Sequence, residues 1–209
     1  AGIGGNRKLW GDEHEVTNVE YNPKIAKILQ DFYPNDEVIV GDAHEYLLKH
    51  YKEFDFIWSS PPCPTHSRIR KNTSLQMGSE EVYPDMALYQ EIIFLKHHFK
   101  GKWVVENVCA YYEPLIKPQE VNRHWFWANF IISNINLPSQ DISFIKKNDT
   151  LFGRNIGGYD LDQEYNHVKV LRNMVNPRLG KHIFDCAFKI KQQTLNTQNQ
   201  NNKNKGDKN

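Results

Sequence analysis

The sequence predicts an α/β fold built on a doubly wound, mainly parallel β-sheet. Two observations lead to this prediction: short apolar runs alternate with segments of helical spacing, and most of these runs end in glycine-rich or polar residues. Strands that alternate with helices form parallel sheets covered on both faces. Such sheets bind ligands beyond the carboxyl ends of their strands, so the functional site is expected in those end segments.

The predicted elements follow one another without an internal repeat. Five apolar runs are predicted strands: "VTNVE" (16–20), "EVIV" (37–40), "FDFIW" (54–58), "KWVVENV" (102–108) and "NRHWFWANF" (122–130). Three segments carry apolar residues at helical spacing and are predicted helices: "PKIAKILQDFY" (23–33), "AHEYLLKHY" (43–51) and "PDMALYQEIIFLKHHF" (84–99). Pro23 suits the first turn of its helix, because no backbone N–H donor is needed there.

The composition is that of one folded domain with a polar tail. The chain has 209 residues, and its 39% hydrophobic content with five tryptophans is enough for a core. We therefore predict a single domain over residues 1–191, and we see no second one. Segment 192–209 is almost free of apolar residues and cannot offset its ordering entropy, so we expect it to be disordered.

Charge and cysteine content restrict the partners and the compartment. The formal net charge is +1, so a nucleic-acid partner would have to meet a local basic patch. Cys63, Cys109 and Cys186 are an odd number without close spacing, and no secretory leader is visible, which favours a reducing cytosol. No apolar run approaches the ~18 residues of a membrane span. We expect a soluble, cytoplasmic monomer.

Three segments at strand ends together indicate a cofactor that contains adenosine. Gly2, Gly4 and Gly5 of "AGIGG" let the backbone approach a ligand, although an ordinary turn fits the same pattern. Glu20 is a natural acceptor for paired ribose hydroxyls, or else a solvated carboxylate. Asp42 either accepts from an adenine amino group or caps the following helix. The absence of a phosphate-binding lysine argues against a nucleotide triphosphatase.

Cys63 lies in a rigid loop just after a predicted strand. Pro61 and Pro62 precede it and prevent the loop from relaxing into a helix. A thiol presented there is a candidate nucleophile, and the alternative is an inert packed cysteine. His66 does not indicate a cysteine protease, because base and nucleophile are distant in sequence in that class. The histidines and cysteines have no recognised zinc-ligand spacing, so no metal is expected.

Charged residues accompany Cys63 and the last predicted parallel strand. Glu106 follows the apolar "WVV", where a carboxylate is costly unless it has a partner or a role. It could share a proton with a substrate, or it could be a strand-end acid in solvent. Arg68, Arg70 and Lys71 follow Cys63 and form a candidate phosphate-binding cluster, or else a solvated loop.

In this order and spacing, "AGIGG", "VE", "GDA", "PPCP", "ENV" and "RHWFWANF" resemble the cytosine-5 DNA methyltransferases. The resemblance covers residues 1 to about 130, and Pro-Cys together with Glu-Asn-Val is a specific combination. "LRNMVNPRLGKHIF" (171–184) resembles the closing motif of small phage-type members. Amino-methyltransferases carry an aromatic residue after Pro-Pro, where this chain has Cys63.

The resemblance implies a Rossmann-like fold, S-adenosylmethionine as cofactor and a double-stranded DNA substrate. The thiolate of Cys63 would add to carbon 6 of a flipped cytosine, and Glu106 would bond the ring nitrogen and amino group. Arg123 would orient the base and Glu106. The cofactor would be held by Gly2, Gly4, Gly5, Glu20, Tyr21, Asp42, Ala43, Pro61 and Asn176. DNA would be contacted by Ser67, Arg68, Arg70 and Lys71. Restriction–modification, phage self-protection and regulation, in a bacterial or phage-infected cytosol, stay open as roles.

Three features differ from the family's pattern. The family has an apolar strand before the glycine loop, whereas this sequence starts at Ala1 within the motif, so we expect the two neighbouring strands to expose unpaired edges. The family's two arginines are represented by Arg123 alone, which is followed by His124. The target-recognition region is reduced to about residues 135–168. Candidate contacts in that region are Lys146, Lys147 and Arg154.

Three alternative functions remain. The same chemistry could act on RNA, since the tRNA-methylating branch shares Pro-Cys and Glu-Asn-Val. A catalytically silent protein that binds the cofactor or nucleic acid would fit the absent strand and the single arginine. A dinucleotide-dependent oxidoreductase would explain the glycine loop but would leave Cys63 and Glu106 without a joint purpose.

Overall fold

The computed structural model describes residues 1–68, 83–138, 149–162 and 165–188, so the predicted tail, 192–209, lies outside the described residues. The strands are β1 (Thr17–Glu20), β2 (Glu37–Val40), β3 (Phe56–Ser59), β4 (Lys102–Val108), β5 (Gln119–Val121), β6 (His124–Ala128), β7 (Thr150–Leu151) and β8 (Arg154–Asn155). The helices are η1 (Arg7–Leu9), α1 (Pro23–Phe32), α2 (Ala43–His50), η2 (Tyr51–Glu53), α4 (Ala87–His98), α6 (His167–Arg172) and α7 (Pro177–Phe188). All of the predicted strands and helices are present, with ends shifted by a few residues.

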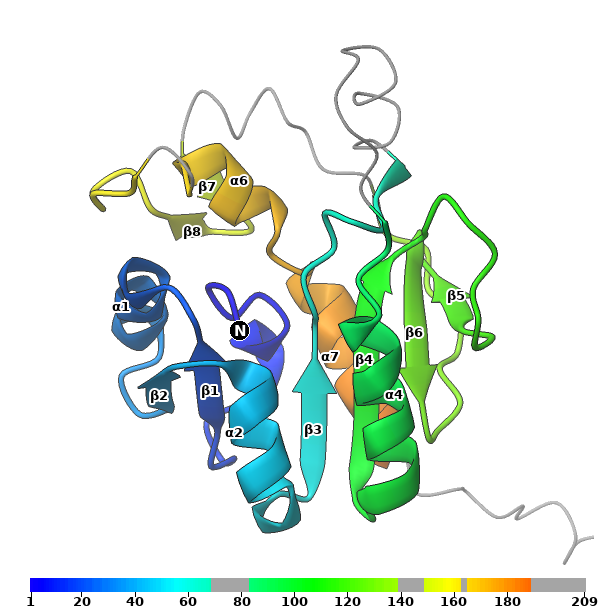
Figure 1. Ribbon diagram of the computed structural model, residues 1–209. Helices are drawn as coiled ribbons and strands as arrows, with labels where there is room; N and C mark the ends of the chain where they lie inside the picture. The colour runs from blue at the N-terminus through cyan, green and yellow to red at the C-terminus, as the bar shows by residue number, and fades with distance from the viewer. Residues whose placement is uncertain (69–82, 139–148, 163–164, 189–209) are drawn as a thin grey trace, which may run out of the picture.

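The strands form two sheets and a separate hairpin (Figure 1). β1 pairs with β2 in parallel, and β3 pairs with β4 in parallel. β6 lies antiparallel to β4, and β5 lies antiparallel to β6, which gives the order β3-β4-β6-β5. The chain is therefore α/β, with the first four strands in parallel pairs. The fifth predicted strand, 122–130, contributes antiparallel pairing instead.

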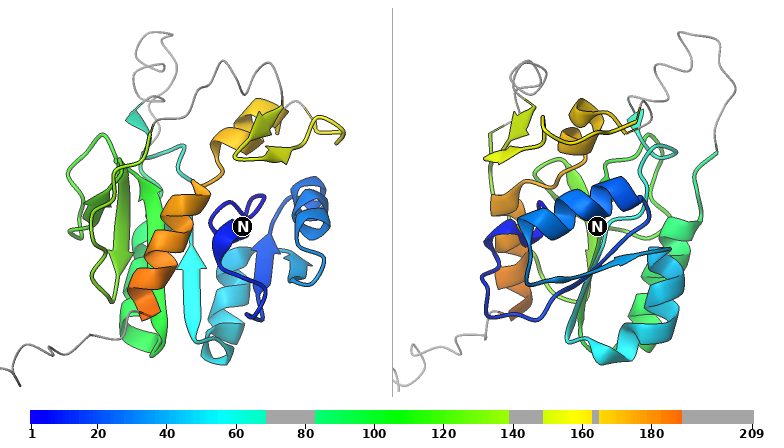
Figure 2. Two further views of the ribbon diagram at one scale, coloured as in Figure 1. Left: turned by 180° about the vertical axis from the view of Figure 1, so that it is seen from behind. Right: turned by 90° about the vertical axis from the view of Figure 1, so that its left-hand side faces the viewer.

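β4 lies inside the larger sheet, which has a helix on each face (Figures 1 and 2). Trp103 and Val105 pack with the apolar residues of α4. Val104 packs on the other face with the apolar residues of α7. Because side chains alternate along a strand, Glu106 lies on the α7 face and Asn107 on the α4 face. This alternation decides which neighbours the two functional candidates meet.

α7 is a helix that the sequence analysis did not predict. Pro177 stands at its first position, and Leu179, Ile183 and Cys186 are buried at helical spacing. Gly180 lets the helix approach the start of the chain, because a Cβ there would come within 2.5 Å of the Asn6 backbone. α7 thus connects the core of the larger sheet to the glycine loop.

β1 and β3 each pair with a strand on one side only in the part of the chain that the structure describes. The N-terminus lies between them in the front and rear views (Figures 1 and 2), and the Ala1 nitrogen donates to the Val19 carbonyl at 2.8 Å. This agrees with the expectation of unpaired edges. In the described ranges, no helix is long and apolar enough to cross a membrane.

Candidate active site

The glycine loop is packed between α1 and the segment before α7. Gly2 and Gly4 have φ angles of 60° and 69°, in the region that favours glycine. A Cβ at Gly4 would come within 2.6 Å of the Tyr33 ring, and the Tyr33 hydroxyl donates to the Gly4 carbonyl at 2.6 Å. A Cβ at Gly5 would come within 2.2 Å of Met174. Around Gly2 a Cβ would meet nothing within 4 Å, so this backbone is open to a ligand.

Glu20 ties the end of β1 to the glycine loop. Its Oε2 accepts the Gly2 N–H at 2.7 Å, and its Oε1 accepts the Asn22 N–H at 3.0 Å. The next residue, Tyr21, is 74% exposed. The structure therefore joins Gly2 to Glu20, with the exposed Tyr21 next along the chain, and contact of these residues with a cofactor stays a prediction.

Asp42 and Asn176 each cap a helix. The Asp42 carboxylate accepts the Glu45 N–H at 2.9 Å, and Ala43 is the first residue of α2. The Asn176 side chain accepts the Arg178 N–H at 2.9 Å at the start of α7. Capping, one of the two alternatives for Asp42, is confirmed, and contact of either residue with a cofactor stays a prediction.

The cysteine loop turns tightly and is hydrogen-bonded to β4. The Cys63 carbonyl accepts the backbone N–H groups of His66 and Ser67, at 3.0 and 3.1 Å. The Asn107 side chain donates to the Pro61 carbonyl at 3.1 Å. These bonds hold the thiol-bearing turn against the end of the strand that carries Glu106.

His66 and Arg68 anchor the other side of this loop. His66 is 1% exposed, and its Nδ1 lies 2.6 Å from the Tyr112 hydroxyl. Burial lowers the pKa of His66, and the charge of Asp85 opposes this effect. The Arg68 Nε donates to the Ala110 carbonyl at 2.8 Å, so this predicted DNA contact also secures the loop. Four other basic candidates lie outside the described residues: Arg70, Lys71, Lys146 and Lys147.

The Cys63 thiol is partly buried, and the negative charge of Glu106 acts on it. Burial raises the pKa of Cys63 above the ordinary value for cysteine, and the Glu106 carboxylate raises it further. The thiol is therefore protonated in the free protein at neutral pH. Cys63 follows the end of β3, and Glu106 lies near the end of the neighbouring strand β4, so the two predicted site residues come from adjacent strand ends.

Glu106 is paired with His124, a residue for which no role was predicted. Its Oε1 lies 2.7 Å from the His124 Nδ1, and Glu106 is only 8% exposed. Asn122 and Arg123, with φ angles of 48° and 66°, form the two-residue turn between β5 and β6. Arg123 is exposed at this turn, and its predicted contacts with the base and Glu106 stay predictions. The only sign of the His124–Glu106 pair in the sequence was that a histidine follows the single arginine of the motif.

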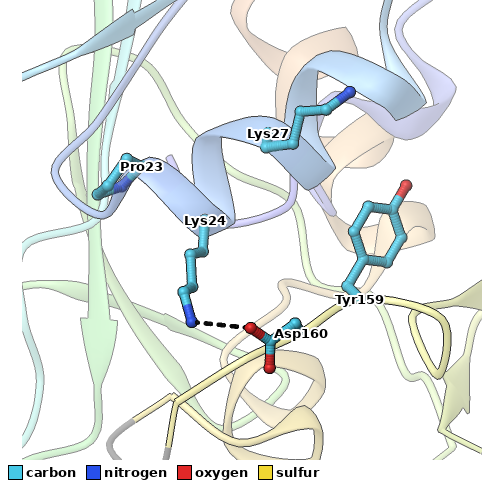
Figure 3. A pocket seen from close by; sticks show the side chains of 5 residues that line it. All are labelled: Pro23, Lys24, Lys27, Tyr159 and Asp160. Carbon is cyan, nitrogen blue, oxygen red and sulfur yellow. Dashed lines mark hydrogen bonds and ion pairs between the residues drawn. The ribbon is translucent and has the colours of Figure 1, made fainter.

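Two other features lie outside this site. The Arg154 guanidinium, a predicted nucleic-acid contact, lies 4.3 Å from the Phe32 ring centroid. A surface pocket is lined by Pro23, Lys24, Lys27, Tyr159 and Asp160 (Figure 3). Its lysines are paired with acids, Lys24 with Asp160 and Lys27 with Asp31, so it offers little free charge to a ligand. In the described part of the chain, no three His, Cys, Asp or Glu residues are grouped to hold a metal ion.

Comparison with known proteins gives one match. A family model described as "C-5 cytosine-specific DNA methylase" matches residues 1–113. The matched span includes the glycine loop, Cys63 and Glu106, and it ends before His124. No curated protein and no solved structure matches the chain.

Proposed function

The chain belongs to the family of C-5 cytosine-specific DNA methylases, and we propose that it transfers a methyl group from S-adenosylmethionine to carbon 5 of a cytosine in DNA. Family membership supports cytosine-5 methyltransferase activity. The observation that carries the mechanism is the attachment of the cysteine loop to β4, through the Asn107 side chain and the Pro61 carbonyl, which brings Cys63 within the electrostatic influence of Glu106. A nucleophile beside an acid–base group is what a covalent route to carbon 5 requires.

The ends of β1 and β2 fit S-adenosylmethionine. Tyr21 and Val40, 74% and 56% exposed, offer apolar surface to an adenine ring. Glu20 accepts the Gly2 and Asn22 N–H groups and the Ala1 amino group, and a carboxylate has about four acceptor positions, so about one position, on Oε1, is left for a ribose hydroxyl. The proposed set is completed by Gly2, Gly4, Gly5, Asp42, Ala43, Pro61 and Asn176. When bound, the cofactor supplies an electrophilic methyl group.

Cys63 and Glu106 act in turn on a cytosine that has left the DNA stack. The Cys63 thiolate forms a bond to carbon 6, the electron pair of the 5,6 double bond moves to carbon 5, and the ring nitrogen takes a proton held by Glu106. Carbon 5 would then bond to the methyl carbon as the bond from that carbon to the sulfonium sulfur breaks, so the cofactor would leave as a neutral thioether, and the ring nitrogen would return its proton to Glu106. Loss of the carbon 5 proton restores the double bond, breaks the bond to sulfur and frees the thiolate. Arg123 is the proposed orienting group for the base.

The same proposal includes the DNA contacts, the Rossmann-like arrangement of the strands and the target-recognition region. Ser67 and Arg68 follow Cys63 directly, and with Arg70 and Lys71 they would bind phosphates around the flipped base. The doubly wound, Rossmann-like arrangement would have β1–β2 and β3–β4 as its parallel halves. The short segment 135–168 would serve as the target-recognition region.

Covalent trapping tests this function directly. The protein is incubated with S-adenosylmethionine and a pool of random-sequence duplexes in which 5-fluorocytosine replaces cytosine, then separated under denaturing conditions. Fluorine at carbon 5 blocks the final proton loss, so an active enzyme stays attached to the DNA. We expect a protein–DNA band that disappears in Cys63→Ser.

Cys109→Ser is the matched control, because Cys109 is also a partly buried thiol but is not among the residues proposed to act on the base. This variant should form the same band as the unchanged protein. Absence of any band from folded protein would contradict the DNA assignment, and a band on the corresponding RNA pool would reassign the substrate. A band that survives Cys63→Ser would remove Cys63 as nucleophile.

A further inference from the structure

The contact between His124 and Glu106 has no role in the mechanism above. We propose that His124 is the positioning residue for Glu106: its Nδ1–H holds the Oε1 atom, which leaves Oε2 to bond the cytosine ring. This inference rests on the proposed function and adds a residue that acts through Glu106. Nδ1 and Oε1 are 2.7 Å apart, a short distance typical of a charge-assisted hydrogen bond.

The strand register explains why these two side chains meet. β4 and β6 are antiparallel, with Glu106 opposite Phe126 and Val108 opposite His124. His124 and Phe126 are two positions apart, so they lie on the same face of the sheet as Glu106. His124 is therefore the diagonal neighbour of Glu106, within reach of a long side chain. Arg123 precedes the strand and lies in the turn between β5 and β6.

Burial makes the hydrogen bond from His124 important for Glu106. The Glu106 side chain is 10% exposed and that of His124 is 32% exposed, so water supplies little of the hydrogen bonding that the carboxylate needs. Without a donor on Oε1, Glu106 would turn toward another partner or toward solvent. A single fixed donor from a strand residue holds one oxygen and leaves the other available.

An imidazole also suits this position chemically. A guanidinium is always charged and would hold Glu106 as a carboxylate. An imidazole can donate from Nδ1 while it is neutral, so it can orient Glu106 without fixing its charge. This matters for a group that has to hold a proton and pass it to the ring nitrogen. The charge of Glu106 also acts on Cys63, a second titratable group, and raises its pKa.

Single-turnover trapping on 5-fluorocytosine DNA tests the inference, at saturating S-adenosylmethionine and DNA. His124→Leu removes the donor, and we expect the adduct to form roughly 10²-fold more slowly, as for other misplaced catalytic groups. His124→Asn places an amide N–H near the position of Nδ1 and should restore the rate to within about tenfold. The DNA concentration for half-maximal rate should not change in either variant.

Two controls separate positioning from a structural role. His50→Leu removes a histidine that is also paired with a glutamate, Glu53, at 3.0 Å. This variant should form the adduct at the rate of the unchanged protein. In a Glu106→Ala background, His124→Leu should cause no further loss, because there is no carboxylate to position. An equal loss in that background, an unaffected His124→Leu or a folded His124→Asn without rescue would each overturn the inference.

A spectroscopic readout keeps the test independent of activity. In the unchanged protein, the His124 ring proton on Nδ1 should give a slowly exchanging downfield proton resonance, which is lost in Glu106→Ala. If no adduct forms at all, the proposed function fails, and this resonance still decides the pairing. Its absence from the unchanged protein would overturn the inference.

Discussion

At the residue scale, the charge of Glu106 acts on the Cys63 thiol in the free protein, and under the proposed mechanism this effect ends when the base binds. In the free protein, burial and the negative charge of Glu106 both raise the pKa of Cys63. Once Glu106 holds a proton against the ring nitrogen, its charge no longer opposes ionisation of the thiol. Under the proposed mechanism, binding of the correct base therefore favours the thiolate that attacks it.

Glu106→Gln should change two rates in opposite directions. Removal of the negative charge lowers the pKa of Cys63, so alkylation by iodoacetamide at neutral pH should become faster. Adduct formation with fluorinated DNA should become about 10²-fold slower, because the group that shares the proton is gone. Mass spectrometry of the Cys63 peptide measures the alkylation.

Cys109 serves as the internal control in the same digest. Burial, with the charge of Glu120, raises its pKa to about 11, and Glu106 is not among the charges that act on it. Its alkylation should therefore be slow and equal in both proteins. Unchanged or slower alkylation of Cys63 in Glu106→Gln would contradict the electrostatic coupling.

At the element scale, the cysteine loop depends on contacts that β4 and the segment after it provide. Asn107 donates to the Pro61 carbonyl, and His66 contacts the Tyr112 hydroxyl. His66 is buried as a neutral ring, since burial lowers its pKa. In the unfolded chain the same imidazole takes up a proton below about pH 6.5.

Acidification should therefore destabilise this protein partly through His66. Because the folded-state pKa is lowered, the contribution is present above the unfolded-state value of about 6.5 and is lost as the pH falls below it. We expect the free energy of unfolding, measured in urea, to fall by at most about 1.4 kcal/mol per pH unit from this group.

His66→Asn should show a smaller loss between about pH 7.5 and 5.5, since asparagine does not titrate. The matched control variant is His50→Asn, because His50 is only half-buried and is also paired with another side chain, Glu53. If the two variants have equal pH dependence, His66 is not the buried titrating group.

At the scale of the whole molecule, the larger sheet and the glycine-loop region have separate cores. β4 is paired on both sides and lies between α4 and α7. β1 is paired with β2 alone in the described chain, and the residues around the glycine loop form a different cluster with α1 and α6. Glu106 thus lies on a strand that is paired on both sides, whereas Glu20 ends a strand that is paired on one side in the described residues.

Hydrogen exchange should report this difference. Backbone amides of Val104 and Val105 in β4 should exchange slowest. Those of Asn18 and Val19 in β1 should exchange at least roughly tenfold faster, because β1 is paired on one side only among the residues that the structure describes. Native-state exchange followed by fragment mass spectrometry measures both. Equal protection of β1 and β4 would show that the two sheets open as one unit.

Local patterns in the sequence were sufficient for most of the elements up to β6 and for naming the principal site candidates, but not for α6 and α7. The alternation of apolar runs and helical spacing predicted β1 to β4, β6 and the helices between them, because these periods are set by neighbours along the chain. Cys63 and Glu106 were identified because proline and buried-strand contexts make their positions unusual. Family membership over residues 1–113 agrees with the motifs that carried the resemblance.

Only the tertiary structure decided which residues meet. The packing of Gly5 on Met174, the bond from Asn107 to Pro61 and the pairing of His124 with Glu106 all join segments far apart in the sequence. The reason is physical: strand pairing and register follow from long-range packing, and a shift of one residue would turn His124 to the opposite face of the sheet. The sequence alone determined the elements and the chemistry available at their ends, and the register determined the partner of Glu106.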